Sequence, residues 1–205
     1  FLPEGWSLVT LPKGPFAGAN LLVAFIDRHL DLDPEGKPVD PYSSRSVAIL
    51  NYGASPDVPG VRFFVTRVYE TPPVANSYGN GVAAVISHDT NSKGPAEGDR
   101  QQQEMWSVRP DTGGEISLSL SYRPGRASWS SSEATPHSSV TPEFHRIYRY
   151  QQLADLAMSV PMGKPLNGEL SFASSVPELS GVFDGNEALV GVLAIPVYVR
   201  EVFLP

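Results

Sequence analysis

The stretch Glu115-Ile116-Ser117-Leu118-Ser119-Leu120-Ser121-Tyr122 decides the fold class, because apolar and polar residues alternate along it without interruption. Side chains of a β-strand point alternately to opposite faces of a sheet, so Ile116, Leu118, Leu120 and Tyr122 share one face. The serines share the other face. This segment therefore predicts a half-buried strand that places one face in a hydrophobic core.

A second strand is predicted from Val61 to Tyr69, a segment rich in β-branched and aromatic residues. Strict alternation along it predicts one shared face for Val61, Phe63, Val65, Arg67 and Tyr69. Arg67 would then lie on a mostly apolar face. Turn residues bound further predicted strands at Ser46–Tyr52, Val82–His88, Glu104–Arg109, Glu169–Ala173 and Ala188–Phe203.

Other segments give weaker or different signals. Asn20–Leu30 suits a buried strand as well as a short helix, and we assign it as a strand. Pro196 should bend the last strand or place it at a sheet edge. The best helix candidate is Phe144–Met158, which has Pro142 before it, Pro161 after it and a second half rich in Ala and Leu. Composition predicts loops at Arg123–Pro142 and Asp89–Gln103.

Composition agrees with a mainly β chain. The 205 residues include 18 Gly and 20 Pro, spread without a repeat, which leaves little room for long helices. Apolar residues make up 41% of the chain, enough to bury a core. We therefore expect a single, mainly β domain over residues 1–205 with one or two short helices.

Charge and residue usage exclude several classes of partner and chemistry. The net charge of −7 disfavours a surface that tracks phosphates, so nucleic acid is not an expected partner. The absence of Cys excludes disulfides and thiolate chemistry. No apolar stretch approaches ~20 residues, so no membrane-spanning helix is expected. Because the chain begins at Phe1, we expect a preceding segment to have been removed; the compartment stays unknown, and a homo-oligomer is compatible with the sequence.

Motifs for metals and cofactors fail on inspection, so no cofactor and no metal are expected. Asp31-Leu-Asp33-Pro-Glu35-Gly36 opens like a calcium loop, but Tyr42 occupies the position of the bidentate Glu. Gly79–Ala84 matches a relaxed dinucleotide fingerprint, yet it precedes a strand and predicts a hairpin turn. The four histidines lack metal-ligand spacing, so only folding could assemble a metal site from them.

Arg67 is the most informative polar residue. A guanidinium on an apolar face must be paired or must bind an anion, since its desolvation alone is prohibitive. Its carboxylate could belong to Glu70, Glu104 or Asp89, or to a substrate. His88 is in phase with Val82, Ala84 and Ile86 on its strand, and a hydrogen-bonded core histidine is the alternative to a catalytic one.

The order of segments resembles the acetoacetate decarboxylase-like superfamily over about two thirds of the chain. The segments that carry the resemblance are Leu11–Pro15, the strand pair Ser46–Tyr52 and Val61–Glu70, Val82–Asp89 followed by Gly98-Asp99-Arg100, and Gly168–Gly185. The resemblance implies a closed or cone-shaped β-barrel with few helices. It also implies a lysine that forms a Schiff base, but the corresponding stretch from Arg100 to Ser107 contains no Lys. Chemistry through a lysine imine is therefore not expected, and Lys93 is the nearest remaining amine.

Three functions are compatible with these observations. The first is a cofactor-independent lyase, isomerase or cyclase with an apolar barrel cavity, acting by acid–base chemistry on a small carbonyl, carboxylate or polyketide-like compound. The second is a non-catalytic binding protein for a small hydrophobic acid, and the third is a structural protein with a filled core. The expected catalytic residues are Arg67, Glu104, His88 and Tyr69, and the expected substrate-binding residues are Phe63, Val65, Arg100 and Trp106.

Overall fold

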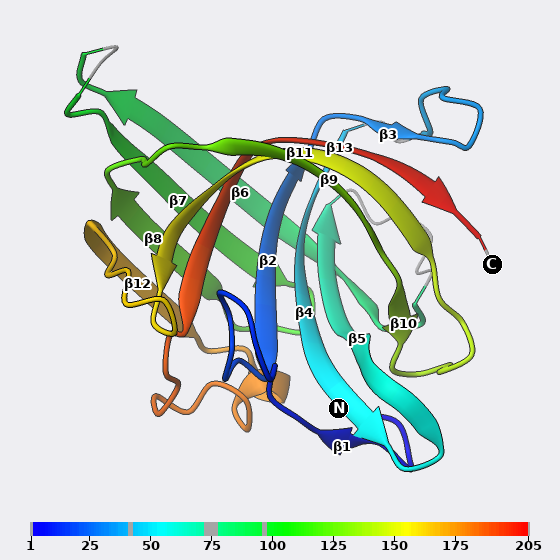
Figure 1. The fold of residues 1–205 in the computed structure, drawn as a ribbon. Helices are drawn as coiled ribbons and strands as arrows, with labels where there is room; N and C mark the ends of the chain where they lie inside the picture. The colour runs from blue at the N-terminus through cyan, green and yellow to red at the C-terminus, as the bar shows by residue number, and fades with distance from the viewer. Residues whose placement is uncertain (1, 41–42, 72–77, 96–97, 205) are drawn as a thin grey trace.

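The computed structural model describes residues 2–40, 43–71, 78–95 and 98–204, and strands dominate this part of the chain (Figure 1). The strands are β1 (Ser7–Leu8), β2 (Leu21–Arg28), β3 (Asp31–Leu32), β4 (Ser44–Ser55), β5 (Val58–Thr71), β6 (Gly81–Lys93), β7 (Gln101–Pro110), β8 (Ile116–Tyr122), β9 (Ser128–Ala134), β10 (Pro136–Ser138), β11 (Ile147–Ser159), β12 (Gly168–Ser174) and β13 (Gly191–Phe203). A short 3-10 helix, η1, covers Pro177–Leu179. The predicted mainly β fold is confirmed.

The described strands form two sheets. Nine of them form one sheet in the order β1-β4-β5-β6-β7-β8-β12, with β2 also paired to β4 and β10 to β5. The other four form a second sheet in the order β3-β13-β11-β9. Figure 1 shows that the large sheet is strongly curled, like half of a barrel, and that β9, β11 and β13 arch across it.

The largest core cluster lies on the inner face of this curl. The rings of Phe25 on β2 and Phe172 on β12 have centroids 6.4 Å apart, although these strands come from distant parts of the strand order. Burial of this face removes a continuous apolar surface from water and is the main stabilising contribution. The buried members are Val47, Ile49, Tyr69, Ala84, Ile86, Trp106, Val108, Ile116, Val176 and Leu179.

Most strand predictions are confirmed. The alternating segment that opened the sequence analysis is β8, with Ile116 completely buried and paired to Val108 of β7. The ambiguous segment Asn20–Leu30 contains the strand β2. Pro196 falls in the register shift of β13 between Ala194 and Val197, where a missing backbone N–H does not interrupt the ladder.

The helix predicted at Phe144–Met158 is wrong, because this segment forms strand β11. Pairing with β13 on one edge and β9 on the other satisfies its backbone, which overrides the helix propensity of its Ala and Leu residues. The expected main helix is thus replaced by strand, and η1 is the helix found among the described residues. No helix in that part of the chain is long and apolar enough to cross a bilayer.

The loop predicted at Arg123–Pro142 is also wrong in part, because it contains β9 and β10. Strand β9 lies at the edge of the smaller sheet and exposes its serines, so it lacks the apolar alternation on which the strand prediction depends. The polar connection predicted at Asp89–Gln103 is shorter than expected, since β6 runs to Lys93 and β7 begins at Gln101.

Strict alternation along β5 fails at Thr66. Val65 pairs with Leu50 of β4 and Arg67 pairs with Ile49, which leaves Thr66 as an extra residue between them. Such a bulge shifts the alternation by one residue. Arg67 and Tyr69 therefore face the inner core cluster, whereas Phe63 and Val65 pack in a second cluster with Leu50 on the opposite face. The predicted shared face of these four side chains is wrong.

The turn between β7 and β8 provides a test of close packing. Gly113 and Gly114 both have positive φ, but a Cβ on Gly114 would lie 2.5 Å from the carbonyl oxygen of Ser175, whereas Gly113 faces open space. Gly113→Ala should cost about 1 kcal/mol of unfolding free energy through backbone strain alone, and Gly114→Ala about 2 kcal/mol more than that. Denaturant unfolding of both variants measures the difference. An equal loss of unfolding free energy in both variants would show that the backbone at Ser175 moves aside without cost.

Candidate functional site

A histidine held between two carboxylates lies on the inner face of the large sheet. The Nδ1 atom of His88 on β6 lies 2.9 Å from Oδ2 of Asp27 on β2, and its Nε2 atom lies 2.6 Å from Oε2 of Glu104 on β7. The side chains of His88, Asp27 and Glu104 are 12%, 18% and 24% exposed. The sequence analysis singled out His88 and Glu104, and folding brings them together.

Sheet register explains why these groups meet. His88 pairs with Trp106 across β6 and β7, and Thr90 pairs with Glu104, so all four side chains share one face. The rings of His88 and Trp106 are stacked, with centroids 3.9 Å apart and an interplanar angle of 12°. Phe25 of β2 packs against the same indole at 5.5 Å. The imidazole is therefore fixed by an aromatic surface and by a hydrogen bond at each nitrogen.

Further polar side chains fix the two carboxylates. The Nε atom of Arg45 lies 3.2 Å from Oδ1 of Asp27, the oxygen that does not face His88. The hydroxyl of Thr90 and the amide of Gln102 donate to Oε1 of Glu104 at 3.0 and 2.8 Å. Each carboxylate thus has one oxygen bound to His88 and the other bound to a supporting donor, an arrangement that fixes the positions of all three side chains.

The hydrogen bonds of this cluster require an additional proton. A neutral imidazole has one donor and one acceptor nitrogen, but both nitrogens of His88 face carboxylate oxygens, which only accept when ionised. The pattern is complete when the ring donates from both nitrogens or when Glu104 carries a proton that it donates to Nε2. The hydrogen-bond pattern therefore calls for one proton more than a neutral imidazole between two carboxylates supplies.

The pKa of Asp27 reports on this cluster. Burial alone would raise this pKa, but the hydrogen bonds from His88 and Arg45 outweigh it and lower the pKa below its usual value. A carboxyl with a lowered folded-state pKa stabilises the fold above about pH 4 and loses that contribution as the pH falls through its folded pKa. Wild type should lose stability on acidification from about pH 5, and this part of the loss should be absent in Asp27→Asn.

Urea unfolding at intervals between about pH 5 and pH 2 measures the effect. The exposed Asp57 provides the matched control, since its substitution by Asn removes a carboxyl that has no ion pair or side-chain acceptor role among the described contacts. Parallel stability curves for wild type and Asp27→Asn over this whole range would contradict the prediction.

Tyr122 lies at the same end of the inner face. It pairs with Gln102 across β7 and β8, next to the pair formed by Leu120 and Glu104. Burial, together with the negative charges of Asp155 and Glu104, raises the pKa of Tyr122 to about 12. Its hydroxyl is therefore protonated at neutral pH and can serve as a donor.

A cavity of about 390 Å³ opens beside this end of the strands. It is lined by Gly98, Asp99, Arg123, Pro124, Gly125, Ala157, Lys164, Pro165 and Asn167. Behind Gly125, which lines the cavity, Asp155 is only 4% exposed and accepts the N–H of Gly125 at 2.6 Å. Arg123 directly follows Tyr122 in the chain, so the cavity adjoins the strand ends that carry Tyr122 and Glu104.

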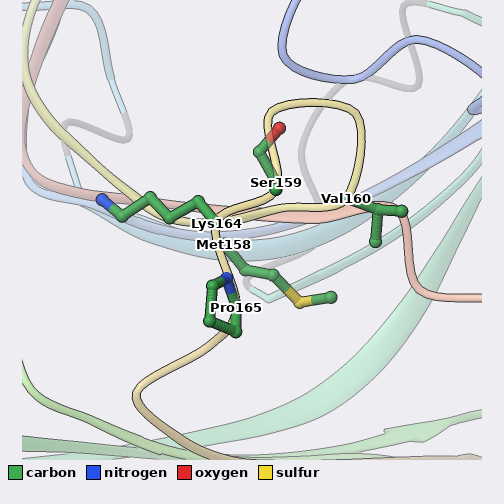
Figure 2. Close-up of a pocket in the computed structure, with 6 residues that line it drawn as sticks. Met158, Ser159, Val160, Lys164 and Pro165 are labelled. Carbon is green, nitrogen blue, oxygen red and sulfur yellow. The ribbon is translucent and has the colours of Figure 1, made fainter.

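A second cavity, of about 340 Å³, is lined by Met158, Ser159, Val160, Gly163, Lys164 and Pro165 (Figure 2). Figure 2 shows the Ser159 and Lys164 side chains pointing in different directions. The Ser159 hydroxyl donates instead to the carbonyl oxygen of Pro15 at 2.6 Å. The ammonium of Lys164 donates to the Leu156 carbonyl and lies 4.0 Å from Asp155. These two residues therefore do not form a nucleophile and base pair.

Arg67 and Tyr69 form a separate cluster with Glu178. The guanidinium of Arg67 donates to Glu178 at 2.6 Å and to the carbonyl oxygen of Asn80 at 3.2 Å. The Tyr69 hydroxyl donates to the other Glu178 oxygen at 2.7 Å. Burial and the adjacent Glu178 carboxylate both raise the pKa of Tyr69. The carboxylate partner of Arg67 is thus Glu178 of η1, not Glu70, Glu104 or Asp89, and the cluster fastens η1 to the sheet.

The remaining predicted residues are dispersed. Trp106 stacks on His88, but Phe63 and Val65 face away from the inner cluster, and Arg100 is exposed. Lys93 is exposed as well. Sequence reasoning missed Asp27, although it is in phase with Val23 and Phe25 on the predicted strand, and the argument that singled out Arg67 applies to it equally.

The acidic segment Asp31–Gly36, which resembles the start of a calcium loop, is stabilised by its own hydrogen bonds. Asp33 Oδ1 accepts the N–H groups of Glu35 and Lys37 at 3.0 and 2.8 Å, which closes a local turn. Tyr42, at the twelfth position, lies outside the described residues. Among the described residues, no group of three or more His, Asp or Glu side chains is arranged to hold a metal ion.

Comparison of the chain with models of protein families, with curated proteins and with solved structures found no match. The function is therefore inferred from the geometry of the chain itself.

Proposed function

We propose that this protein is an acid–base enzyme of the lyase or isomerase type, which moves a proton on a small carbonyl, carboxylate or polyketide-like compound without a lysine imine. One observation carries the proposal: both nitrogens of His88 are hydrogen-bonded to carboxylates, in a cluster stacked on Trp106 and lined by apolar residues. A preorganised proton donor and acceptor beside an apolar surface is what such reactions need.

Each residue of the cluster has a distinct role in this proposal. Glu104, the most exposed of the three side chains, exchanges the proton with the substrate. His88 supplies or takes up that proton at Nε2, and Asp27 fixes the ring through Nδ1. The substrate approaches from the side of the cavity beside Arg123, and the protonated hydroxyl of Tyr122, the residue before Arg123, donates to a developing oxyanion.

We further propose that the curled sheet is a cone-shaped barrel related to the acetoacetate decarboxylase-like superfamily, closed by side-chain packing. The contact between Phe25 and Phe172 supports this closure, because β2 and β12 belong to opposite ends of the strand order. Strand β7 occupies the stretch in which the resemblance implies the lysine, and it presents Glu104 to the inner face. A carboxylate at this place supports proton transfer in place of imine chemistry.

A binding protein for a small hydrophobic acid is the alternative function. The cavity beside Arg123 favours it, because Lys164 and Arg123, the latter paired with Asp99, line the cavity together with prolines and Ala157. A ligand carboxylate could bind there without any chemical step. This alternative does not require the proton stored between Asp27 and Glu104.

Deuterium exchange tests the proposal directly. A panel of β-keto acids, methyl ketones and enolisable esters is incubated with the protein in D₂O, and NMR records exchange at the α-carbon and loss of carboxylate. Wild type should accelerate exchange for at least one class of compound. His88→Asn should abolish this acceleration, whereas His29→Asn, at an exposed position outside the cluster, should keep it.

Three further results decide between the functions. Borohydride added during turnover should leave the protein mass unchanged, since no imine forms; a mass increase on Lys93 or Lys164 would contradict this. Binding of a panel compound without exchange would support the binding protein. Neither exchange nor binding across the panel would reject both functions.

A further inference from the structure

Folding brings two histidines together at a place remote in sequence from the acid–base cluster. His137 lies on β10 and His145 lies just before β11, and the two residues form an isolated antiparallel bridge. Their ring centroids are 4.9 Å apart with an interplanar angle of 36°. Eight positions separate them in the chain, so sequence spacing gives no sign of the pair.

Backbone contacts fix the same tautomer on both rings. The Nδ1 atom of His137 lies 3.2 Å from the Pro142 carbonyl oxygen, and that of His145 lies 3.4 Å from the Glu143 carbonyl oxygen. A carbonyl oxygen only accepts, so each Nδ1 carries the proton and each Nε2 keeps its lone pair. In the described part of the chain, neither Nε2 has a hydrogen-bond partner. A metal-binding histidine has this pattern, with Nδ1–H on a backbone carbonyl and Nε2 available.

The distance between the rings also suits one shared ion. Two imidazoles that bind one ion at about 2.1 Å through their nitrogens, at an angle of about 90–110°, have ring centroids about 4.6–5.3 Å apart. The negative charge of Glu143 acts on the His137 ring and would attract a cation to this place.

The positive charge of Arg62 acts against a cation here, and its guanidinium is placed 5.1 Å from the ring centroid of Trp6. A site with two imidazoles and solvent is weaker than the closed four-ligand sites of structural zinc. It would nevertheless connect β10 to the segment that leads into β11, where the N–H of Ser138 already donates to the Phe144 carbonyl at 2.9 Å.

We propose that His137 and His145 form a two-histidine site for a divalent transition-metal ion, with water completing its coordination. Imidazole ligands select Zn²⁺, Ni²⁺ and Cu²⁺ over Mg²⁺ and Ca²⁺, and Cu²⁺ binds most tightly in this series. The ion stabilises the connection between β10 and β11 and plays no part in proton transfer at His88.

Metal titration of the whole chain tests this site. Cu²⁺ added in equal amount should give an EPR spectrum with coupling to two imidazole nitrogens, and Zn²⁺ should raise the melting temperature, whereas Mg²⁺ should not. His145→Asn should lower the affinity for either ion by at least about tenfold, since loss of even an outer-shell partner costs about 10–100-fold. His29→Asn should bind as wild type does.

His137→Asn is the second variant, and circular dichroism verifies that each variant is folded before its affinity is measured. Loss of one nitrogen coupling in both variants, with the fold retained, would establish the pair as ligands. Equal affinity of wild type, His145→Asn and His137→Asn, or no specific binding of either ion at about 100 μM, would overturn the proposal.

Discussion

Replacing Arg67 by methionine is expected to lower the free energy of unfolding by about 3–4 kcal/mol. The guanidinium bonds to Glu178 at 2.6 Å, and the two side chains are only 23% and 28% exposed. Methionine keeps the apolar stem and removes the charge, so the Glu178 carboxylate would stay on the inner face with Tyr69 as its remaining side-chain donor. An unpaired, largely buried carboxylate is the source of the cost.

Thermal unfolding provides the measurement. A loss of this size should lower the melting temperature by about 6–16 °C in a chain of this length. Arg123→Met is the matched control, because Arg123 and its partner Asp99 form an ion pair at 2.9 Å but are 57% and 80% exposed. Such a surface pair should contribute at most about 1 kcal/mol.

A double variant distinguishes two causes of the lost stability: the unpaired carboxylate of Glu178 and the lost packing of the Arg67 side chain. Arg67→Met combined with Glu178→Gln removes both charges, and it should recover at least half of the lost stability if the buried carboxylate causes the loss. An unchanged melting temperature in Arg67→Met, together with lost ligand binding, would instead assign Arg67 to a binding role. That result would contradict the structural role derived from its contacts with Glu178 and Asn80.

The difference between the predicted and observed roles of Arg67 has one local cause. Periodicity predicts which residues share a face only while the strand pairs regularly, and the extra residue at Thr66 shifts the alternation of β5. No signal in the sequence of β5 marks this bulge, because Thr is a common strand residue. The partner Glu178 lies 111 positions away, a separation that local patterns cannot bridge.

More of the His88 cluster than of the Arg67 cluster could be predicted from the sequence, because the positions of His88 and Glu104 follow from the register of adjacent strands. His88 and Glu104 lie on adjacent antiparallel strands, and their alternation with apolar neighbours was visible in the sequence. The register itself depends on the length of the connection between β6 and β7, which composition overestimated. Asp27 joins the cluster only because the large sheet curls and brings β2 over β6 and β7, which is a property of the whole fold.

Strands β9 and β11 show where local sequence patterns fail to predict a strand. Strand β9 carries a run of serines, and β11 carries Ala and Leu in its second half, so each segment lacks the local pattern of a strand. Both become strands because they pair with each other and β11 also pairs with β13. Tertiary hydrogen bonding therefore decided these two segments, and intrinsic propensity did not.

Glu104→Gln is expected to reduce the proposed proton transfer by about 10²–10⁴-fold, the range that a positioned acid or base contributes. Glutamine keeps the shape of the side chain and can still accept from Thr90 and Gln102 through its amide oxygen. Its NH₂ group then faces Nε2 of His88, which makes that nitrogen an acceptor. The cluster keeps its geometry but loses the proton that it stores, so the fold should persist while turnover falls.

The rate of α-carbon exchange in D₂O, with the compound that wild type exchanges fastest, measures this effect. Glu115→Gln is the matched control, because Glu115 directly precedes β8, accepts the hydroxyl of Ser107 at 2.5 Å and is 42% exposed. Its variant should retain the exchange rate within about twofold, since a group that does not touch the reacting atoms adds no term to proton transfer. Full exchange activity in Glu104→Gln with an unchanged melting temperature would show that the carboxylate only orients His88. The imidazole itself would then be the group that meets the substrate.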